Sequence, residues 1–350
     1  MPRKPVSIAV MGAGLIGKRH IDLIAAHREA SLHCVIDPAE AGRELALKHG
    51  VPWHLDLASM LAQCKPDGLI IATPNQLHTS HGLVALQAGI PMLIEKPLAD
   101  TVEGGQTLVA AADAAGIPLL TGHHRRHNPM IQRAKAFINE GRLGRIVAVH
   151  AFFWLMKPDD YFDVYWRRQP GAGPVLINFI HDIDLLRYLC GDVEAVQAFS
   201  ARNIRQHDVD ESAAIILRFA SGALGSITVS DTIVAPWSWE QTSGENPAYP
   251  QTGQSCYHIG GTHGALSVPQ LDLWRNPGAR SWLEPFETER FHFDQADPLD
   301  LQIGQFCAVI RGEQSPLVSG RDGLANLRIV DAVQRAAREG ILVEVTNKSD

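Results

Sequence analysis

The sequence lacks long hydrophobic runs, any excess of positive charge and a paired set of cysteines. Its cysteines number five, an odd count, and no two of them form a C-x-x-C pair. We therefore expect reduced and mostly buried thiols, which are typical of a cytoplasmic enzyme. They stand at positions 34, 64, 190, 256 and 307.

Charge and hydropathy argue against two classes of partner. The chain has 38 acidic and 31 basic residues, scattered along its length, for a net charge of −7. This balance predicts neither a nucleic-acid surface nor attraction to an anionic membrane. No apolar stretch approaches the ~20 residues of a membrane span. The first apolar segment, after Arg3 and Lys4, is a predicted strand with no cleavage-site pattern behind it, so no signal peptide is expected.

The 350 residues suit two domains. In the first third of the chain, short apolar runs alternate with helical patterns, which predicts an α/β fold with a doubly wound parallel sheet. The predicted strands are 6–11, 32–36, 68–72, 91–94 and 117–120, and the predicted helices between them are 15–28, 39–49, 76–89 and 101–115.

The pattern changes after Gly122. Longer strands with period-two alternation predict an antiparallel sheet with one face covered. They lie at 145–155, 194–205, 211–220 and 223–233, with helices at 128–140, 298–312 and 321–339. We therefore expect a nucleotide-binding domain over residues 1–122, a substrate-binding α+β domain over residues 123–350, and ligand chemistry at the seam between them.

The first predicted strand runs into a glycine-rich turn that fits a dinucleotide phosphate site. The segment reads Gly12-Ala13-Gly14-Leu15-Ile16-Gly17, and a helical stretch follows. Gly12 permits the tight turn, Gly14 lets a pyrophosphate approach the backbone, and Gly17 lets the helix pack close to the strand. The helix N-terminus, at Leu15 and Ile16, offers N–H groups and a positive dipole to the phosphates. These residues predict a Rossmann domain.

The second apolar run ends on Asp37, twenty residues beyond Gly17. A carboxylate at this place accepts hydrogen bonds from the ribose diol and repels a 2′-phosphate. No arginine follows in Pro38-Ala39-Glu40. NAD is therefore predicted over NADP.

Ligands of parallel sheets bind beyond the carboxyl ends of the strands, so the residues after each run matter most. We expect cofactor contacts from the residues that follow the 68–72 and 91–94 runs, and we expect Lys96 to emerge at the nicotinamide end. A strand-end lysine that is merely solvated is the alternative. The expected contacts are Thr73, Pro74, Asn75, His78, Glu95 and Lys96.

A further candidate lies on a predicted helix over residues 176–190, which Gly191 ends. Asn178, His181 and Asp182 share one face of this helix, at steps of three and four residues. An imidazole near a helix N-terminus is pushed towards its neutral, base-competent form. A packed or capping histidine is the alternative.

Together these motifs resemble the Gfo/Idh/MocA oxidoreductase family over essentially the whole chain. The resemblance rests on the glycine-rich turn and on Ala72-Thr73-Pro74-Asn75, Glu95-Lys96-Pro97, Arg125-Arg126, His181-Asp182-Ile183-Asp184 and Ser319-Gly320-Arg321-Asp322-Gly323. It implies a Rossmann domain and then a domain whose large, mostly antiparallel open sheet mediates homodimers or homotetramers. It also implies NAD(P)-dependent oxidation of a sugar, cyclitol or related alcohol, with Lys96 and His181 as catalytic residues and a cis bond before Pro97.

The chain departs from the family pattern in one place. Many members carry an aspartate four residues before the catalytic histidine, where this chain has Ile177. Asn178 beside it is expected to take over a polar substrate contact, and ordinary inositol or glucose specificity is in doubt. By the same resemblance His124 and Arg125 line the substrate pocket. Arg125 can bind a carboxylate through two parallel hydrogen bonds, so an acidic sugar or hydroxy acid stays among the candidate substrates.

Two more features complete the candidate site. Three histidines stand close together at 123, 124 and 127, but no acidic or cysteine partner completes a set of ligands, so no metal is predicted. Trp166 and Trp237 are predicted walls of the substrate pocket, with packing or a subunit contact as the alternative.

We therefore expect hydride transfer between nicotinamide and a secondary alcohol of a small polyol. His181 is expected to act as general base, and Lys96 to hydrogen-bond the same oxygen. Three alternatives stay open: NAD-dependent glycoside hydrolysis, dehydrogenation of an aromatic cis-dihydrodiol, and a non-catalytic NAD-binding regulator.

Overall fold

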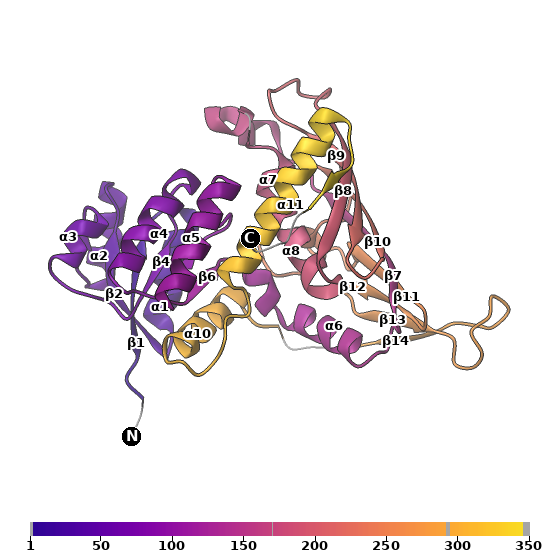
Figure 1. Cartoon of the computed structure of the whole chain (residues 1–350), viewed down its shortest axis with the longest axis horizontal. Helices are drawn as coiled ribbons and strands as arrows, with labels where there is room; N and C mark the ends of the chain where they lie inside the picture. Colours follow the sequence, from indigo (N-terminus) through magenta and orange to yellow (C-terminus); the bar gives the residue numbers. More distant parts are fainter. Residues whose placement is uncertain (1–2, 170, 292–294, 346–350) are drawn as a thin grey trace. The chain divides into compact units, whose positions relative to one another are not determined.

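The computed structural model describes residues 3–169, 171–291 and 295–345, which divide into two compact units (Figure 1). The first unit comprises Met1–His127 and Ala296–Leu327, and the second comprises Asn128–Gln295 and Arg328–Asp350. The predicted division after residue 122 does not include this return of the chain to the first unit. The return has a physical cause, because helix α10 (Pro298–Ile310) buries Ile303, Phe306 and Cys307 in a core of the first unit.

The first unit is built on a six-stranded parallel sheet of order β3-β2-β1-β4-β5-β6, which confirms the predicted doubly wound α/β sheet. Its strands are β1 (Val6–Met11), β2 (Ala30–Ile36), β3 (Trp53–His54), β4 (Gly68–Ile71), β5 (Met92–Ile94) and β6 (Leu119–Thr121). Its other helices are α1 (Leu15–Ala26), α2 (Glu40–His49), α3 (Leu57–Leu61), α4 (His78–Gln87) and α5 (Val102–Ala115).

Alternate residues of these strands enter two different apolar cores. Ile8 and Val10 of β1 pack with residues of α1 and α10, whereas Ala9 and Met11 pack with residues of α4 and α5. Burial on both faces explains why each strand reads as an unbroken apolar run. The strand order changes direction between β1 and β4, and the loops after these two strands form the place where open parallel sheets bind ligands.

The second unit is built on a nine-stranded sheet of order β14-β13-β12-β11-β7-β10-β9-β8-β15. β10 pairs with β7 in parallel and the other described pairs are antiparallel, so the prediction of a large, mostly antiparallel sheet is confirmed. The strands are β7 (Ile146–Trp154), β8 (Val193–Ala201), β9 (Ser212–Phe219), β10 (Leu224–Ser230), β11 (Tyr257–Gly261), β12 (Ala265–Val268), β13 (Asp272–Arg275), β14 (Glu287–Arg290) and β15 (Val343–Glu344).

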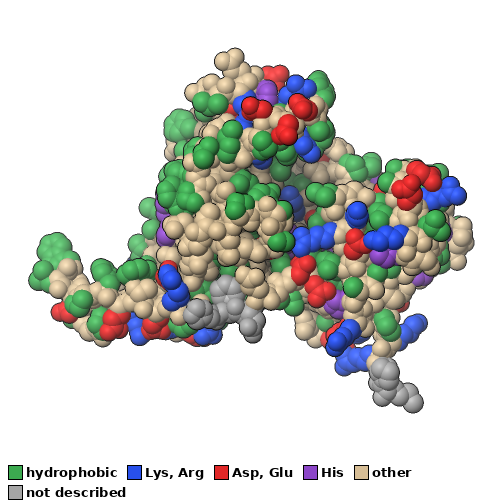
Figure 2. All heavy atoms as spheres, turned by 180° about the vertical axis from the view of Figure 1, so that it is seen from behind, with side chains coloured by type: hydrophobic (Ala, Val, Ile, Leu, Met, Phe, Trp, Pro, Cys, Tyr) green, Lys and Arg blue, Asp and Glu red, His purple; other side chains and the backbone are tan. Residues whose placement is uncertain are grey.

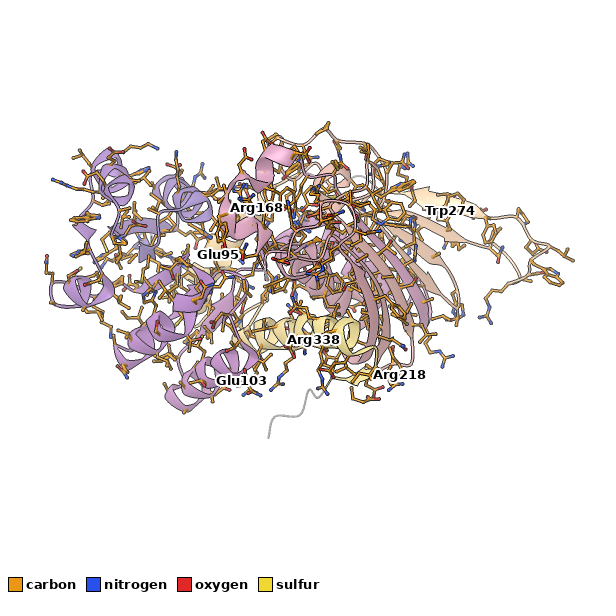
Figure 3. The ribbon with its side chains drawn as sticks, turned by 90° about the horizontal axis from the view of Figure 1, so that it is seen from above. Glu95, Glu103, Arg168, Arg218, Trp274 and Arg338 are labelled. Atoms are coloured by element: carbon orange, nitrogen blue, oxygen red, sulfur yellow. The ribbon has the colours of Figure 1, made fainter. Side chains whose placement is uncertain are left out.

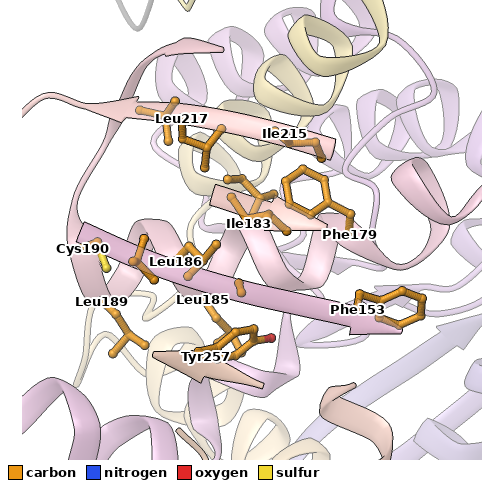
Figure 4. Close-up of a cluster of buried hydrophobic side chains, with 14 of the residues drawn as sticks. Phe153, Phe179, Ile183, Leu185, Leu186, Leu189, Cys190, Ile215, Leu217 and Tyr257 are labelled. Carbon is orange, nitrogen blue, oxygen red and sulfur yellow. The ribbon is translucent and has the colours of Figure 1, made fainter. Parts of the chain in front are cut away.

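One face of this sheet is covered by helices. α6 (Pro129–Asn139), α8 (Phe179–Cys190) and the part of α11 (Gly320–Glu339) that lies in the second unit contribute to a single core with the sheet. Figure 4 shows side chains of α8, among them Phe179, Ile183 and Leu186, against strand residues that include Phe153, Ile215, Leu217 and Tyr257. The opposite face carries residues of alternate register, including Arg218 on β9 and Trp274 on β13 (Figure 3).

On the face drawn in Figure 2, acidic and basic side chains of the described residues lie interspersed. Among the described residues, no helix combines the length and the apolar character that crossing a membrane requires.

Candidate active site

The glycine-rich turn between β1 and α1 is shaped by close contacts at two of its glycines. Gly12 has a φ of +94°, and a Cβ there would lie 2.5 Å from the carbonyl oxygen of Ala72. A Cβ on Gly17 would lie 1.9 Å from the carbonyl oxygen of Gly12. The turn therefore closes tightly only with glycine at both places, because a side chain would push the helix away from the strand.

Gly14 differs from the other two because the space beside it is empty. A Cβ built on Gly14 would meet no atom within 4 Å. Gly14 is also the N-cap of α1, with no side chain bonded to the first helical N–H groups, and Leu15 is 95% exposed. The first N–H groups of a helix have no partner within the helix, and they carry the positive end of its dipole. The open space in front of them at Gly14 therefore fits a pyrophosphate.

Asp37 is fixed beside this turn. Its Oδ2 accepts the N–H of Ala13 at 2.6 Å and its Oδ1 accepts the N–H of Ala39 at 2.7 Å. A carboxylate has about four acceptor positions, so two remain for a ribose diol. Gly42 makes room for the side chain, since a Cβ there would lie 2.4 Å from Cβ of Asp37. The residues thus fit the adenosine half of NAD.

His78 connects two of the predicted cofactor segments. Its Nε2 lies 2.8 Å from the carbonyl oxygen of Thr73, its Nδ1 lies 2.8 Å from that of Pro97, and its side chain is buried. The structure therefore gives His78 a positioning contact between the ends of β4 and β5, which the sequence pattern did not indicate. The Lys96–Pro97 bond is cis, as the resemblance predicts.

Glu95 lies buried at the end of β5. Its Oε1 accepts a hydrogen bond from Nε2 of His20 at 2.7 Å, and its Oε2 lies 3.2 Å from the backbone N–H of Lys96. Burial alone would raise the pKa of Glu95, but the hydrogen bond from His20 and the charges of His20, His124 and Lys96 hold it below its ordinary value. His20 escaped the sequence prediction because a single histidine on a helix carries no signal by itself.

The segment after β6 is a short 3₁₀ turn, His124–His127, with Arg125 and Arg126 buried. Arg126 donates to Asp322 at 3.1 Å and to the carbonyl oxygen of Leu317 at 3.3 Å, so these contacts give Arg126 a structural role. In the described ranges, no three or more histidine, cysteine or acidic side chains gather in a way that could hold a metal ion.

In the second unit, the helix predicted over residues 176–190 is interrupted at Asn178. α7 (Pro174–Ile177) ends there and α8 begins at Phe179. His181 lies in the first turn of α8, 8% exposed, and its N–H donates to the carbonyl oxygen of Asn178 at 3.0 Å. Asp182 is buried beside it, and its carboxylate accepts the hydroxyl of Tyr257.

The two tryptophans have different surroundings. Trp166 is 54% exposed on a 3₁₀ turn, Tyr165–Arg168. Trp237 lies against Phe152 and Trp154, at ring-centroid distances of 5.8 and 5.5 Å. Phe152 and Trp154 alternate along β7 with Phe153, which faces the core that contains α8, so they lie on the opposite face of the sheet. The contact therefore favours the packing alternative for Trp237 over a wall of the substrate pocket.

Comparison with known proteins relates both units to one kind of enzyme. A family model described as an oxidoreductase family with an NAD-binding Rossmann fold matches residues 6–123, and the GFO/IDH/MocA C-terminal domain model matches residues 131–267. The chain is 27% identical to 1,5-anhydro-D-fructose reductase of Ensifer adhaerens over 88% of each chain. It is 25% identical to scyllo-inositol 2-dehydrogenase (NAD(+)) of Bacillus subtilis (strain 168), over 98% of this chain and 97% of that one.

A solved structure is similar over nearly the full length. The WlbA dehydrogenase from Bordetella pertussis, in complex with NADH and UDP-GlcNAcA, is 29% identical with a TM-score of 0.79. The match covers 98% of this chain and 99% of that one.

Proposed function

The chain belongs to the Gfo/Idh/MocA oxidoreductase family, and from this membership we propose that it transfers a hydride between NAD and a secondary alcohol or ketone of a sugar, cyclitol or related polyol. The observation that carries the proposal is the turn at Gly12–Gly17 with Asp37 beside it, in the same unit as Lys96. The cofactor, when bound, supplies the hydride chemistry, and the protein supplies binding, orientation and proton transfer.

In this proposal the reacting oxygen is served by two side chains. His181 takes the hydroxyl proton of the alcohol as general base, while the hydride leaves the same carbon and a carbonyl forms. The ammonium of Lys96 donates a hydrogen bond to that oxygen and stabilises the negative charge that develops on it. In the reverse direction His181 returns the proton. His124, Arg125, Trp166 and Asn178 are proposed to contact the remainder of the substrate.

The substrate class is supported by the relatives and by Arg125. The curated relatives are named for an anhydro sugar and an inositol, and the similar crystal structure holds a nucleotide sugar acid. Arg125 is a buried cation, suited to a carboxylate. Ile177 and Asn178 stand where many members have aspartate and its neighbour, which argues against the ordinary inositol specificity.

The test is a substrate screen with the purified chain. NAD⁺ is mixed with each of a set of polyols, namely anhydro sugars, inositols and sugar acids, and NADH is followed by its absorbance. We expect NADH with at least one compound and a lower rate with NADP⁺. Release of free sugar from a glycoside without net NADH indicates hydrolysis instead. The absence of both activities, with NADH still bound, contradicts an enzymatic role and favours a regulator.

We also propose that the uncovered face of the nine-stranded sheet pairs with a second copy of this chain. Large apolar side chains stand exposed at several places on it, and exposed apolar side chains on one face are typical of an interaction surface. A twofold axis would place the same patch on both subunits. The exposed residues are Phe199, Ile216, Leu224 and Trp274, with exposed fractions of 69%, 54%, 55% and 43%.

Replacing Ile216 by lysine is expected to shift the protein towards the monomer. Ile216 lies on β9 between Gln197 and Ser226 of the neighbouring strands, so a charge there enters the middle of the proposed interface. Light scattering coupled to size exclusion, over a range of protein concentrations, gives the mass. Leu47→Lys is the control, because Leu47 is 82% exposed on α2 of the other unit. Equal masses for the Ile216→Lys variant and the wild-type chain would contradict the proposed interface.

A further inference from the structure

The carboxylate of Glu95 holds three separate segments of the first unit together. It accepts the hydrogen bond of His20 from α1, it lies 3.2 Å from the N–H of Lys96, and it fills the space beside Gly122. A Cβ on Gly122 would lie 2.8 Å from its Cδ and 2.8 Å and 2.9 Å from its two oxygens. His20 is fully buried and Glu95 is 6% exposed, so water competes with none of these contacts (Glu95 is labelled in Figure 3).

The charge of Glu95 decides which of the two residues donates the hydrogen bond. The groups around Glu95 hold its pKa below the ordinary value, so the side chain is a carboxylate at neutral pH. A carboxylate only accepts hydrogen bonds, and Nε2 of His20 must therefore carry the shared proton. A charge-assisted bond of this kind is shorter and about twice as strong as a neutral one.

Each of the three segments carries part of the proposed site. α1 begins at the dinucleotide turn, the end of β5 carries Lys96, and the turn after Gly122 carries His124. We propose that the buried His20–Glu95 pair positions Lys96 relative to the helix that binds the cofactor phosphates. The inference rests on the proposed function, since the pair is proposed to position Lys96 for that reaction.

Stability alone gives little reason for such a pair. A buried ion pair is on average no more stabilising than apolar side chains of the same volume. The same helix offers a comparison, because Asp22 of α1 pairs with Nε2 of His49 at 2.9 Å. That pair has the same chemistry, lies closer to the surface and joins α1 to α2, away from Lys96. Of the two pairs, His20–Glu95 is the one that contacts the segments carrying Lys96 and His124.

Glu95→Gln tests the charge, because glutamine keeps nearly the same shape. The first readout is the labelling of Lys96 by acetic anhydride as a function of pH, followed by peptide mass spectrometry. Lysine reacts as the free amine, and removal of the adjacent negative charge lowers the midpoint for Lys96 by about one pH unit. The titratable groups that face Glu95, namely His20, His124 and Lys96 itself, remain in this variant.

The second readout is kinetic, on whichever polyol the screen identifies. We expect kcat to fall about 10²-fold, because a small misplacement of a catalytic group costs that much, while KM and the NADH dissociation constant change little. His20→Leu removes the donor and is expected to act like Glu95→Gln. His20→Gln keeps a donor and is expected to recover most of the loss. His49→Gln is the matched control and is expected to leave both readouts unchanged.

Unchanged labelling and unchanged kcat in Glu95→Gln would overturn the inference. The same holds if His49→Gln shifts the labelling of Lys96 as much as Glu95→Gln does. If Glu95→Gln does not fold, the two His20 variants decide between the same outcomes. Failure of the proposed function is seen separately, as wild-type protein that oxidises no polyol although the labelling midpoint of Lys96 still depends on Glu95.

Discussion

We expect Lys96→Met to lower the kcat of the proposed polyol oxidation by about 10³-fold and to leave the dissociation constant of NADH nearly unchanged. Methionine has a similar length but no charge and no donor, so the developing alkoxide loses the hydrogen bond that Lys96 is proposed to donate. A factor of 10³ corresponds to about 4 kcal/mol of transition-state stabilisation. Lys96→Arg is expected to recover little, because the planar guanidinium places its donors elsewhere.

The partner of this experiment is His181→Asn, which removes the proposed base. We expect kcat to fall by about 10²- to 10⁴-fold and the rise of kcat/KM with pH to lose the limb that reports the imidazole. If both groups serve one oxygen, the double variant loses much less than the product of the single losses. Lys48→Met and His263→Asn are controls, since both side chains are exposed and neither belongs to the proposed site. Full turnover in either site variant would refute its proposed role.

The nucleotide half of this site was readable in the sequence because its determinants are local. Gly12, Gly14 and Gly17 stand within six residues, and the contacts that need them form within one strand–turn–helix unit. Asp37 follows at the end of the adjacent strand, and its contact with Ala13 uses only the parallel pairing of β1 with β2. The apolar runs gave the sheet for a similar reason, since burial on both faces leaves a continuous pattern.

Contacts between distant segments were not readable. His20 and Glu95 are 75 residues apart and form a pair only when α1 packs across the end of β5. The return of α10 to the first unit depends on an apolar face that would suit either core. β3 and β15 have two residues each and α3 has five, which are too few residues to show a periodic hydrophobic pattern. The break at Asn178 has no mark in the sequence pattern, and neither has the contact of Asp210, from a separate loop, which accepts the N–H of Val175 at the start of α7.

Two glycines of the turn, Gly17 and Gly14, predict different effects, which separate folding from binding. Gly17→Ala places a methyl group 1.9 Å from the carbonyl oxygen of Gly12, so the turn or the helix must shift. We expect a loss of about 3 kcal/mol in the free energy of unfolding, measured in urea. Gly14 has a φ of −66°, which any residue adopts, and open space beside it.

Gly14→Val is therefore expected to fold with nearly the stability of the wild-type chain, within about 1 kcal/mol, because valine there is a poorer cap but meets no atom. Its side chain fills the cradle in front of the N-terminus of α1, and the pyrophosphate can no longer approach the backbone N–H groups. We expect the affinity for NADH, measured by fluorescence titration, to fall by about 10²-fold or more. Binding of NADH by this variant at wild-type affinity would show that the cofactor lies elsewhere, and the assignment of every residue around the turn would fall with it.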